Sequence, residues 1–155
     1  MAFYSGVVIL GPRQVGKTTL AKTQLSFGEK EVVIVDLEKP SDLNKLTDAE
    51  RFFETNKDKL VIIDEVQRRP DLFPIIRSAI DDHRVPSRFI LLGSSSDEII
   101  IKSTESLAGR VAYHELHPLS IAEIPLQGIN NLFIYGGYPV TYIASSMPKR
   151  SMGWI

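Results

Sequence analysis

Residues 7–19, with the sequence VVILGPRQVGKTT, give the strongest indication of how this chain folds. A short apolar run leads straight into the pattern G-x-x-x-x-G-K-[ST], which begins at Gly11 and ends at Thr18. Between a strand and a helix this pattern is typical of a loop that binds phosphate. Glycine lets the backbone curve closely around an anion because no Cβ is in the way. The stretch therefore predicts a strand, a phosphate-binding loop and a helix over residues 18–25.

The positions of this loop have separate chemical tasks. Backbone N–H groups at the start of the helix attract an anion. Lys17 would reach the β- and γ-phosphates of a nucleotide, and Thr18 would offer its hydroxyl to Mg²⁺. The expected nucleotide-binding residues are consecutive: Gly11, Pro12, Arg13, Gln14, Val15, Gly16, Lys17, Thr18 and Thr19. A glycine-rich turn that binds nothing is the alternative, and the flanking strand and helix disfavour it.

A second motif carries two acids. The apolar run Leu60–Ile63 is followed directly by Asp64 and Glu65. Asp64 would hold Mg²⁺, directly or through water, and Glu65 would polarise an attacking water. A strand that ends in two solvated acids is the alternative, but the phosphate-binding loop earlier in the chain favours the catalytic interpretation. Asp64 is therefore the candidate Walker B aspartate, and Lys17 is the candidate Walker A lysine.

The second acid of this pair also separates classes of enzyme. An enzyme that activates water needs a general base, whereas a small-molecule kinase has an acceptor other than water. Glu65 therefore favours nucleotide hydrolysis over transfer to a metabolite. The guanine-recognising tetrapeptide N-K-x-D is absent from the sequence, so ATP is the expected nucleotide.

Short apolar runs at four places predict the sheet. They are Val7–Leu10, Val32–Leu37, Leu60–Ile63 and Phe89–Leu92, and a fifth strand is expected around Val111–Leu116. Continuous Val- and Ile-rich runs fit parallel strands that are covered on both faces. Helix-like stretches alternate with them, so the sequence predicts an α/β fold with a parallel sheet between helices.

Two of the helices can be placed by their patterns. One is expected over Asp48–Asn56, and a second carries apolar residues at every fourth position, at 72, 76 and 80. Asp71 is a plausible N-cap of the second helix, and Pro74 is tolerated in its first turn.

Two weaker candidates complete the site. Ser94 follows the fourth apolar run, at the end of the expected strand, and would face the γ-phosphate, although a serine-rich turn that caps a helix starting at Asp97 explains it equally well. Arg110 could stabilise charge in the transition state. A surface arginine or an ion-pair partner is the alternative for Arg110.

Composition limits the remaining possibilities. The 155 residues include 18 basic and 19 acidic side chains, a net charge of -1, so a nucleic-acid or anionic-membrane partner is not supported. With no cysteine, thiolate catalysis and cysteine zinc sites are excluded. No apolar run reaches the roughly 20 residues of a membrane span, and the N-terminus lacks the features of a signal peptide. A cytoplasmic location is expected.

The last quarter of the chain is poor in charge. Residues 116–155 contain only Glu123, Lys149 and Arg150 as charged side chains. A solvated surface normally has more. This region is therefore expected to pack against a partner, a further domain or another copy of the chain.

Taken together, these residues resemble a prokaryotic family of P-loop ATPases of the AAA+ type. The similar stretches are GPRQVGKTTL at 11–20, VDLEKPSDLNKL at 35–46, VIIDEVQRRPDLFPIIRSAID at 61–81, RFILLGSSS at 88–96, ESLAGRVAYHELHPLS at 105–120 and LFIYGGYP at 132–139. The resemblance implies a three-layer P-loop fold whose five parallel strands have the order 5-1-4-3-2. It also implies roles for Lys17, Thr18, Asp64, Glu65 and Ser94, and its A-G-R segment falls on Arg110.

The resemblance has consequences for domain organisation. Members of this family usually continue into a C-terminal domain of unknown function. Residues 1–120 would be the ATPase core, and residues 121–155 would begin a C-terminal region that looks shortened. The leading hypothesis for the function is an Mg²⁺-dependent ATPase. The alternatives are a nucleotide-gated binding module with negligible turnover and, as the weakest, a small-molecule kinase.

Overall fold

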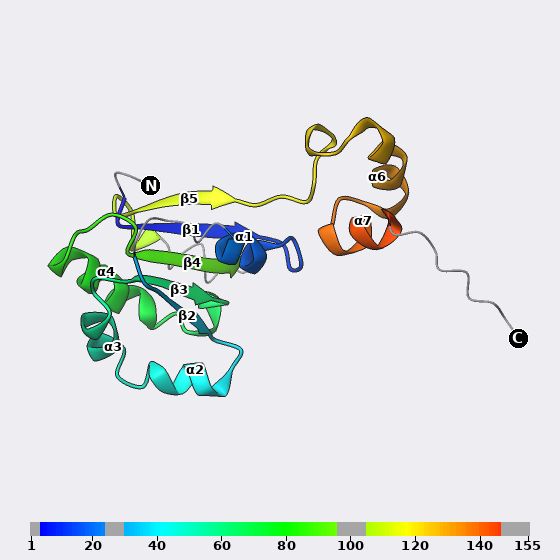
Figure 1. The fold of residues 1–155 in the computed structure, drawn as a ribbon. Helices are drawn as coiled ribbons and strands as arrows, with labels where there is room; N and C mark the ends of the chain where they lie inside the picture. Colours follow the sequence, from blue (N-terminus) through cyan, green and yellow to red (C-terminus); the bar gives the residue numbers. More distant parts are fainter. Residues whose placement is uncertain (1–3, 24–29, 96–104, 147–155) are drawn as a thin grey trace, which may run out of the picture. The chain divides into compact units, whose positions relative to one another are not determined.

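The computed structural model describes residues 4–23, 30–95 and 105–146, and its centre is a five-stranded parallel sheet (Figure 1). Along the sheet the strand order is β2-β3-β4-β1-β5, which confirms the predicted order counted from the opposite edge. The strands are β1 (Gly6–Gly11), β2 (Val32–Asp36), β3 (Leu60–Asp64), β4 (Phe89–Ser94) and β5 (Val111–Glu115). The first four form at the apolar runs, because Val and Ile fit a pleated surface that is covered by helices, and β5 forms where the fifth strand was expected.

The register of the strands brings their last residues to one edge. Gly11 at the end of β1 lies opposite Ser94 at the end of β4. Asp36 at the end of β2 lies opposite Asp64 at the end of β3. Because all pairs are parallel, the loops that follow these residues leave the sheet on the same side. The residues expected to bind phosphate and metal thus begin at a common edge.

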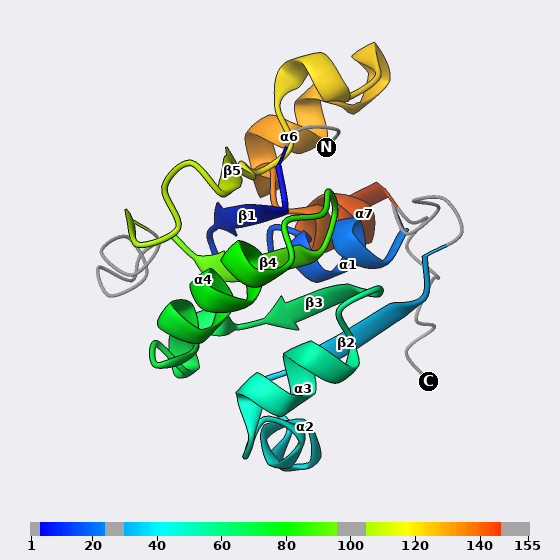
Figure 2. The same ribbon diagram turned by 90° about the vertical axis from the view of Figure 1, so that its left-hand side faces the viewer.

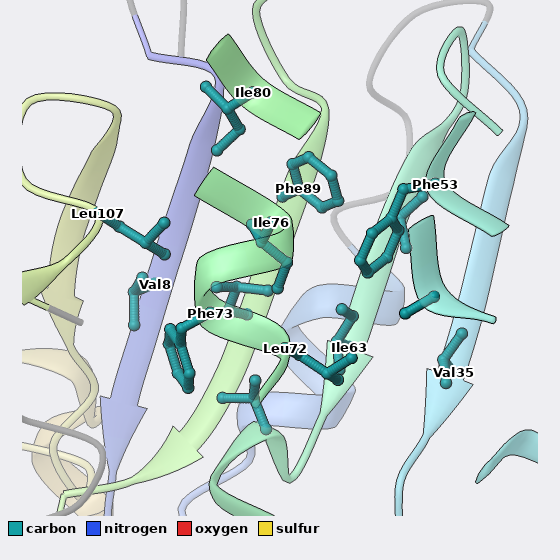
Figure 3. Packing of buried hydrophobic residues seen from close by; sticks show 14 of the residues in the cluster. Val8, Val35, Phe53, Ile63, Leu72, Phe73, Ile76, Ile80, Phe89 and Leu107 are labelled. Carbon is teal, nitrogen blue, oxygen red and sulfur yellow. The ribbon is translucent and has the colours of Figure 1, made fainter. Parts of the chain in front are cut away.

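Helices cover both faces of the sheet (Figure 2). On one face, helices α3 (Ala49–Thr55) and α4 (Leu72–Asp82) pack over a large apolar cluster, and α1 (Lys17–Thr23) lies on the other face with a smaller one. Figure 3 shows Leu72, Phe73 and Ile76 of α4 against Val8 and Ile63 of the strands. Side chains alternate between the faces of a strand, so both clusters draw on the same apolar runs.

The ends of the helices differ in part from the predictions. Asp48, the first residue of the helix expected over 48–56, is the N-cap of α3, since its carboxylate accepts a hydrogen bond of 3.0 Å from the Arg51 N–H. Asp71 precedes α4 as expected but does not cap it, because its side chain accepts hydrogen bonds from the Arg69 guanidinium instead. That bond lowers the pKa of Asp71. Helix α2 (Pro40–Lys45) was not predicted, as its six largely polar residues have no apolar periodicity.

The Arg88 side chain is buried just before β4 and ties the two helices on one face together. Its guanidinium donates to the Phe53 carbonyl of α3 and to the His83 carbonyl that follows α4, each at 3.2 Å. It also donates to the Ala79 carbonyl and lies 5.2 Å from the centre of the Phe89 ring. Burial lowers the pKa of this guanidinium, and the hydrogen bonds offset part of its desolvation cost.

The chain divides into two compact units. The first contains residues 1–12 and 17–116, and the second contains residues 13–16 and 117–155. Within the second unit are the helices α6 (Ile129–Tyr135) and α7 (Pro139–Ser146), preceded by two 3₁₀ turns. Gly137 must be a glycine here, because a Cβ would lie 2.4 Å from the Leu119 carbonyl oxygen. Among the described residues, no helix combines the length and apolar character of a membrane span.

We expect Arg88→Ala to lower the free energy of unfolding by about 2–4 kcal/mol, because three carbonyls lose their donor. Chemical denaturation followed by circular dichroism measures this change. Arg84→Ala is the matched control, since that guanidinium is largely exposed and pairs with Asp81 at 3.4 Å. Equal stability of the two variants would contradict the role assigned to Arg88.

Candidate functional site

A hydroxyl and a carboxylate from distant parts of the sequence meet at the common edge of the sheet. The Thr18 Oγ1 atom at the start of α1 donates a hydrogen bond of 2.7 Å to Asp64 Oδ2 at the end of β3. The other carboxylate oxygen, Oδ1, accepts a hydrogen bond of 3.0 Å from the Glu65 N–H. Asp64 is only 7% exposed. The two predicted metal ligands are therefore in direct contact.

Lys17 is the second buried polar group of this edge. Its Nζ atom donates to the carbonyl oxygens of Gly11 and Pro12, at 2.9 Å each. A charged ammonium that is 6% exposed needs such partners, because desolvation without them costs several kcal/mol. Nζ thus lies beside the carbonyls at which the predicted phosphate-binding loop begins. A phosphate oxygen in place of these carbonyls would offer the ammonium a charged acceptor.

The middle of the loop, residues 13–16, has the backbone that its glycine predicts. Gly16 has a φ of +102°, a conformation that L side chains rarely adopt. Gln14 has a positive φ of 63° as well. Val15 is buried, whereas Arg13 and Gln14 are exposed. Left-handed residues in a short loop turn successive N–H groups toward one side, which is how a backbone forms a concave site for an anion.

Glu65 directly follows β3 and adopts a left-handed conformation, with φ 57° and ψ 43°. This conformation costs a non-glycine residue energy, and such residues cluster at functional sites. It turns the chain from β3 into the 3₁₀ turn η1 (Val66–Arg68). The Gln67 Nε2 atom of η1 donates a hydrogen bond to Glu65 Oε2. Gln67 was not predicted as a site residue, although its polar side chain in the run DEVQ was a visible signal.

Ser94 lies at the same edge of the sheet. It is the last residue of β4, it pairs with Gly11 in the register of the sheet, and it is 6% exposed. The next residue, Ser95, donates its N–H to the Gly11 carbonyl oxygen at 3.3 Å. The helix expected to start at Asp97 lies outside the described residues.

The structure does not bring Arg110 to this edge. Arg110 precedes β5, and its carbonyl accepts a hydrogen bond from the Ser5 N–H beside the start of β1. Its guanidinium binds both carboxylate oxygens of Asp81, at 2.8 and 2.7 Å, and this lowers the pKa of Asp81. The length of β1, at roughly 3.3 Å per residue, separates Arg110 from Gly11 by about 15–20 Å. The ion-pair alternative therefore describes Arg110 within this chain.

The donors at the edge fit a hard cation better than a soft one. Thr18 and Asp64 offer oxygen, and Mg²⁺ is commonly held by one or two protein oxygens together with phosphates and water. Within the described part of the chain, no three His, Cys, Asp or Glu side chains cluster as a metal site.

Comparison with known proteins gives a family and a fold. A family model described as AAA domain matches residues 4–125. The uncharacterized protein Rv2008c of Mycobacterium tuberculosis and the uncharacterized protein Mb2031c of Mycobacterium bovis are each 38% identical over 148 residues, 96% of this chain. The chain spans about a third of the length of these curated relatives, 33% of each.

Among solved structures, the Walker-type ATPase PABY2304 of Pyrococcus abyssi has a similar fold. The TM-score is 0.59 at 15% sequence identity, and the match covers 88% of this chain and 60% of the other. At this identity the likeness supports the architecture alone.

Arg110→Ala should leave the affinity for ATP unchanged, because Arg110 pairs with Asp81 at the far ends of the strands. Isothermal titration calorimetry measures this affinity, with Arg84→Ala as a control for loss of one surface arginine. A drop of more than about fivefold, roughly 1 kcal/mol, would show that Arg110 contacts nucleotide after all.

Proposed function

This chain belongs to the AAA domain family, and we propose that it binds ATP together with Mg²⁺ and hydrolyses the γ-phosphate. One observation carries the proposal: the Thr18 hydroxyl lies 2.7 Å from the Asp64 carboxylate. These two groups come from the helix after the phosphate-binding loop and from the strand with the acidic pair. Their contact supports one shared site for the metal and the triphosphate.

Each residue of the proposed site has a task. The backbone of residues 11–19 binds the phosphates, and Lys17 exchanges its bonds to Gly11 and Pro12 for phosphate oxygens. Thr18 and Asp64 hold Mg²⁺, which when bound neutralises charge on the phosphates. Desolvation by the buried edge of the sheet strengthens these electrostatic interactions.

Hydrolysis itself needs a base and an oriented water. Glu65 accepts a proton as a water oxygen attacks the γ-phosphorus. The bond from this phosphorus to the bridging oxygen breaks, and ADP and inorganic phosphate leave. Ser94, at the end of the neighbouring strand, is the proposed polar contact to the γ-phosphate. Arg110 is not part of this proposal.

A second function is favoured by the surface of the second unit. Among the residues of this unit that the structure describes, the exposed large apolar side chains are Ile121, Leu126, Phe133, Ile134, Tyr135, Tyr138, Val140 and Ile143. An apolar surface of this kind often marks a protein contact. The chain could therefore act as a nucleotide-gated binding module with negligible turnover. A small-molecule kinase remains the weaker proposal, because Glu65 suits water as the acceptor.

The same surface suggests the partner and the location. We propose that it contacts protein, either another copy of the chain or a different partner. A net charge of -1 gives no long-range attraction for nucleic acid or an anionic membrane. Dependence on ATP and Mg²⁺ suits the cytoplasm.

Lys17→Ala should abolish ATP binding, and Glu65→Gln should keep binding while slowing hydrolysis by about 100-fold or more. Calorimetry gives the binding constants, and release of inorganic phosphate gives the rate. Lys22→Ala is the matched control, since Lys22 is an exposed lysine on the same helix. If the Lys17→Ala variant bound ATP with normal affinity, the proposal would be wrong. Tight binding without phosphate release in the unaltered protein would favour the gated module.

Phe133→Ser combined with Val140→Ser should reduce self-association, because these side chains are 81% and 64% exposed. Sedimentation velocity over a range of concentrations measures the effect. Thr141→Ser in the same helix as Val140 is the control. If the unaltered protein sediments as a monomer at every concentration, self-association through this surface is wrong.

A further inference from the structure

The Gln67 side chain faces the proposed general base from the turn that follows it. Its Nε2 donates to Glu65 Oε2. The orientation of this amide is fixed by chemistry, because a carboxylate accepts hydrogen bonds and the opposite flip would place two acceptors together. Both residues are only partly exposed. Gln67 therefore contacts the side chain that is proposed to accept the proton from water.

The backbone on either side of Glu65 is restrained as well. The Glu65 N–H donates to Asp64 Oδ1, and its carbonyl accepts a hydrogen bond of 3.0 Å from the Arg68 N–H. These bonds keep the left-handed conformation in place, but they leave the torsions of the side chain free. The amide of Gln67 is the contact that restrains the carboxylate end.

The carbonyl oxygen of the Gln67 amide indicates that the contact with Glu65 does more than stabilise the fold. The Gln67 Oε1 atom is buried and accepts no hydrogen bond from any residue in the described part of the chain. A buried acceptor of this kind destabilises a fold, and an apolar side chain of the same shape would be neutral or better. By contrast, the neighbouring Arg68 points outward to Glu38, at 3.5 Å.

We propose that Gln67 is a positioning residue, which holds the Glu65 carboxylate in the orientation that activates water. The inference rests on the proposed function, since it assigns a task only if Glu65 is the base. Nε2 fixes one carboxylate oxygen and leaves the other for the water. A displacement of about 1 Å at a catalytic group can cost on the order of 100-fold in rate, so such a restraint has a measurable effect.

The test replaces Gln67 by methionine, which keeps length and shape and removes the donor. We expect kcat for ATP hydrolysis to fall by about tenfold to 100-fold. The KM and the dissociation constant for Mg-ATP should stay within about twofold, because Gln67 is not among the proposed nucleotide ligands. The melting temperature should be unchanged or higher, since the unpaired Oε1 is gone. A residue with only a structural role would not combine lower kcat with unchanged stability.

A double-mutant cycle with Glu65→Gln shows whether Gln67 acts through Glu65. In the Glu65→Gln background, Gln67→Met should cause no further loss of kcat. Gln127→Met is the matched control, because Gln127 is exposed on the second unit. An unchanged or increased kcat of Gln67→Met, or equal losses in both backgrounds, would overturn the inference. If Glu65→Gln itself hydrolyses ATP normally, the proposed function fails instead.

Discussion

The parallel register of the sheet is the constraint on which the site depends. Since β1, β3 and β4 run in the same direction, the chain leaves each of them at one edge, where Gly11, Asp64 and Ser94 lie. This shared exit places the hydroxyl at the start of α1 beside the carboxylate at the end of β3. The 2.7 Å bond between Thr18 and Asp64 follows from the register, and a slip of one residue would turn the Asp64 side chain to the other face.

Polar groups have different roles at the two ends of the strands. At the exit edge, Lys17, Asp64 and Ser94 are all less than a tenth exposed. At the opposite edge, Arg88 holds the carbonyls of α3 and α4, and Arg110 binds Asp81. The first group has donors and acceptors that a ligand can take over. The second pairs with carbonyl and carboxylate oxygens of the protein itself, and its bonds to α3 and α4 stabilise the helices that cover the sheet.

The turn after β3 departs from the usual preferences for backbone conformation and for hydrogen bonding of buried groups. A left-handed glutamate and a buried amide oxygen without a donor are both unfavourable in a stable turn. Sites that break such local rules are the places where function is expected. The exposed apolar side chains of the second unit are a further feature that does not stabilise the fold. This turn and those side chains are therefore the features that a need for stability does not explain.

The strands and the motif residues could be predicted from the amino-acid sequence, because apolar runs and a glycine-lysine loop act through local spacing. The family resemblance added the strand order. Lys17, Thr18 and Asp64 could be named in advance, since each follows directly from its place after a strand. Three contacts could be seen only in the folded chain: Asp71 pairs with Arg69 rather than capping α4, Arg110 binds Asp81, and Gln67 contacts Glu65. The partner of Arg110 lies 29 residues away in the sequence, and the other two contacts depend on the directions that side chains take in short turns. Residue spacing carries no information about either.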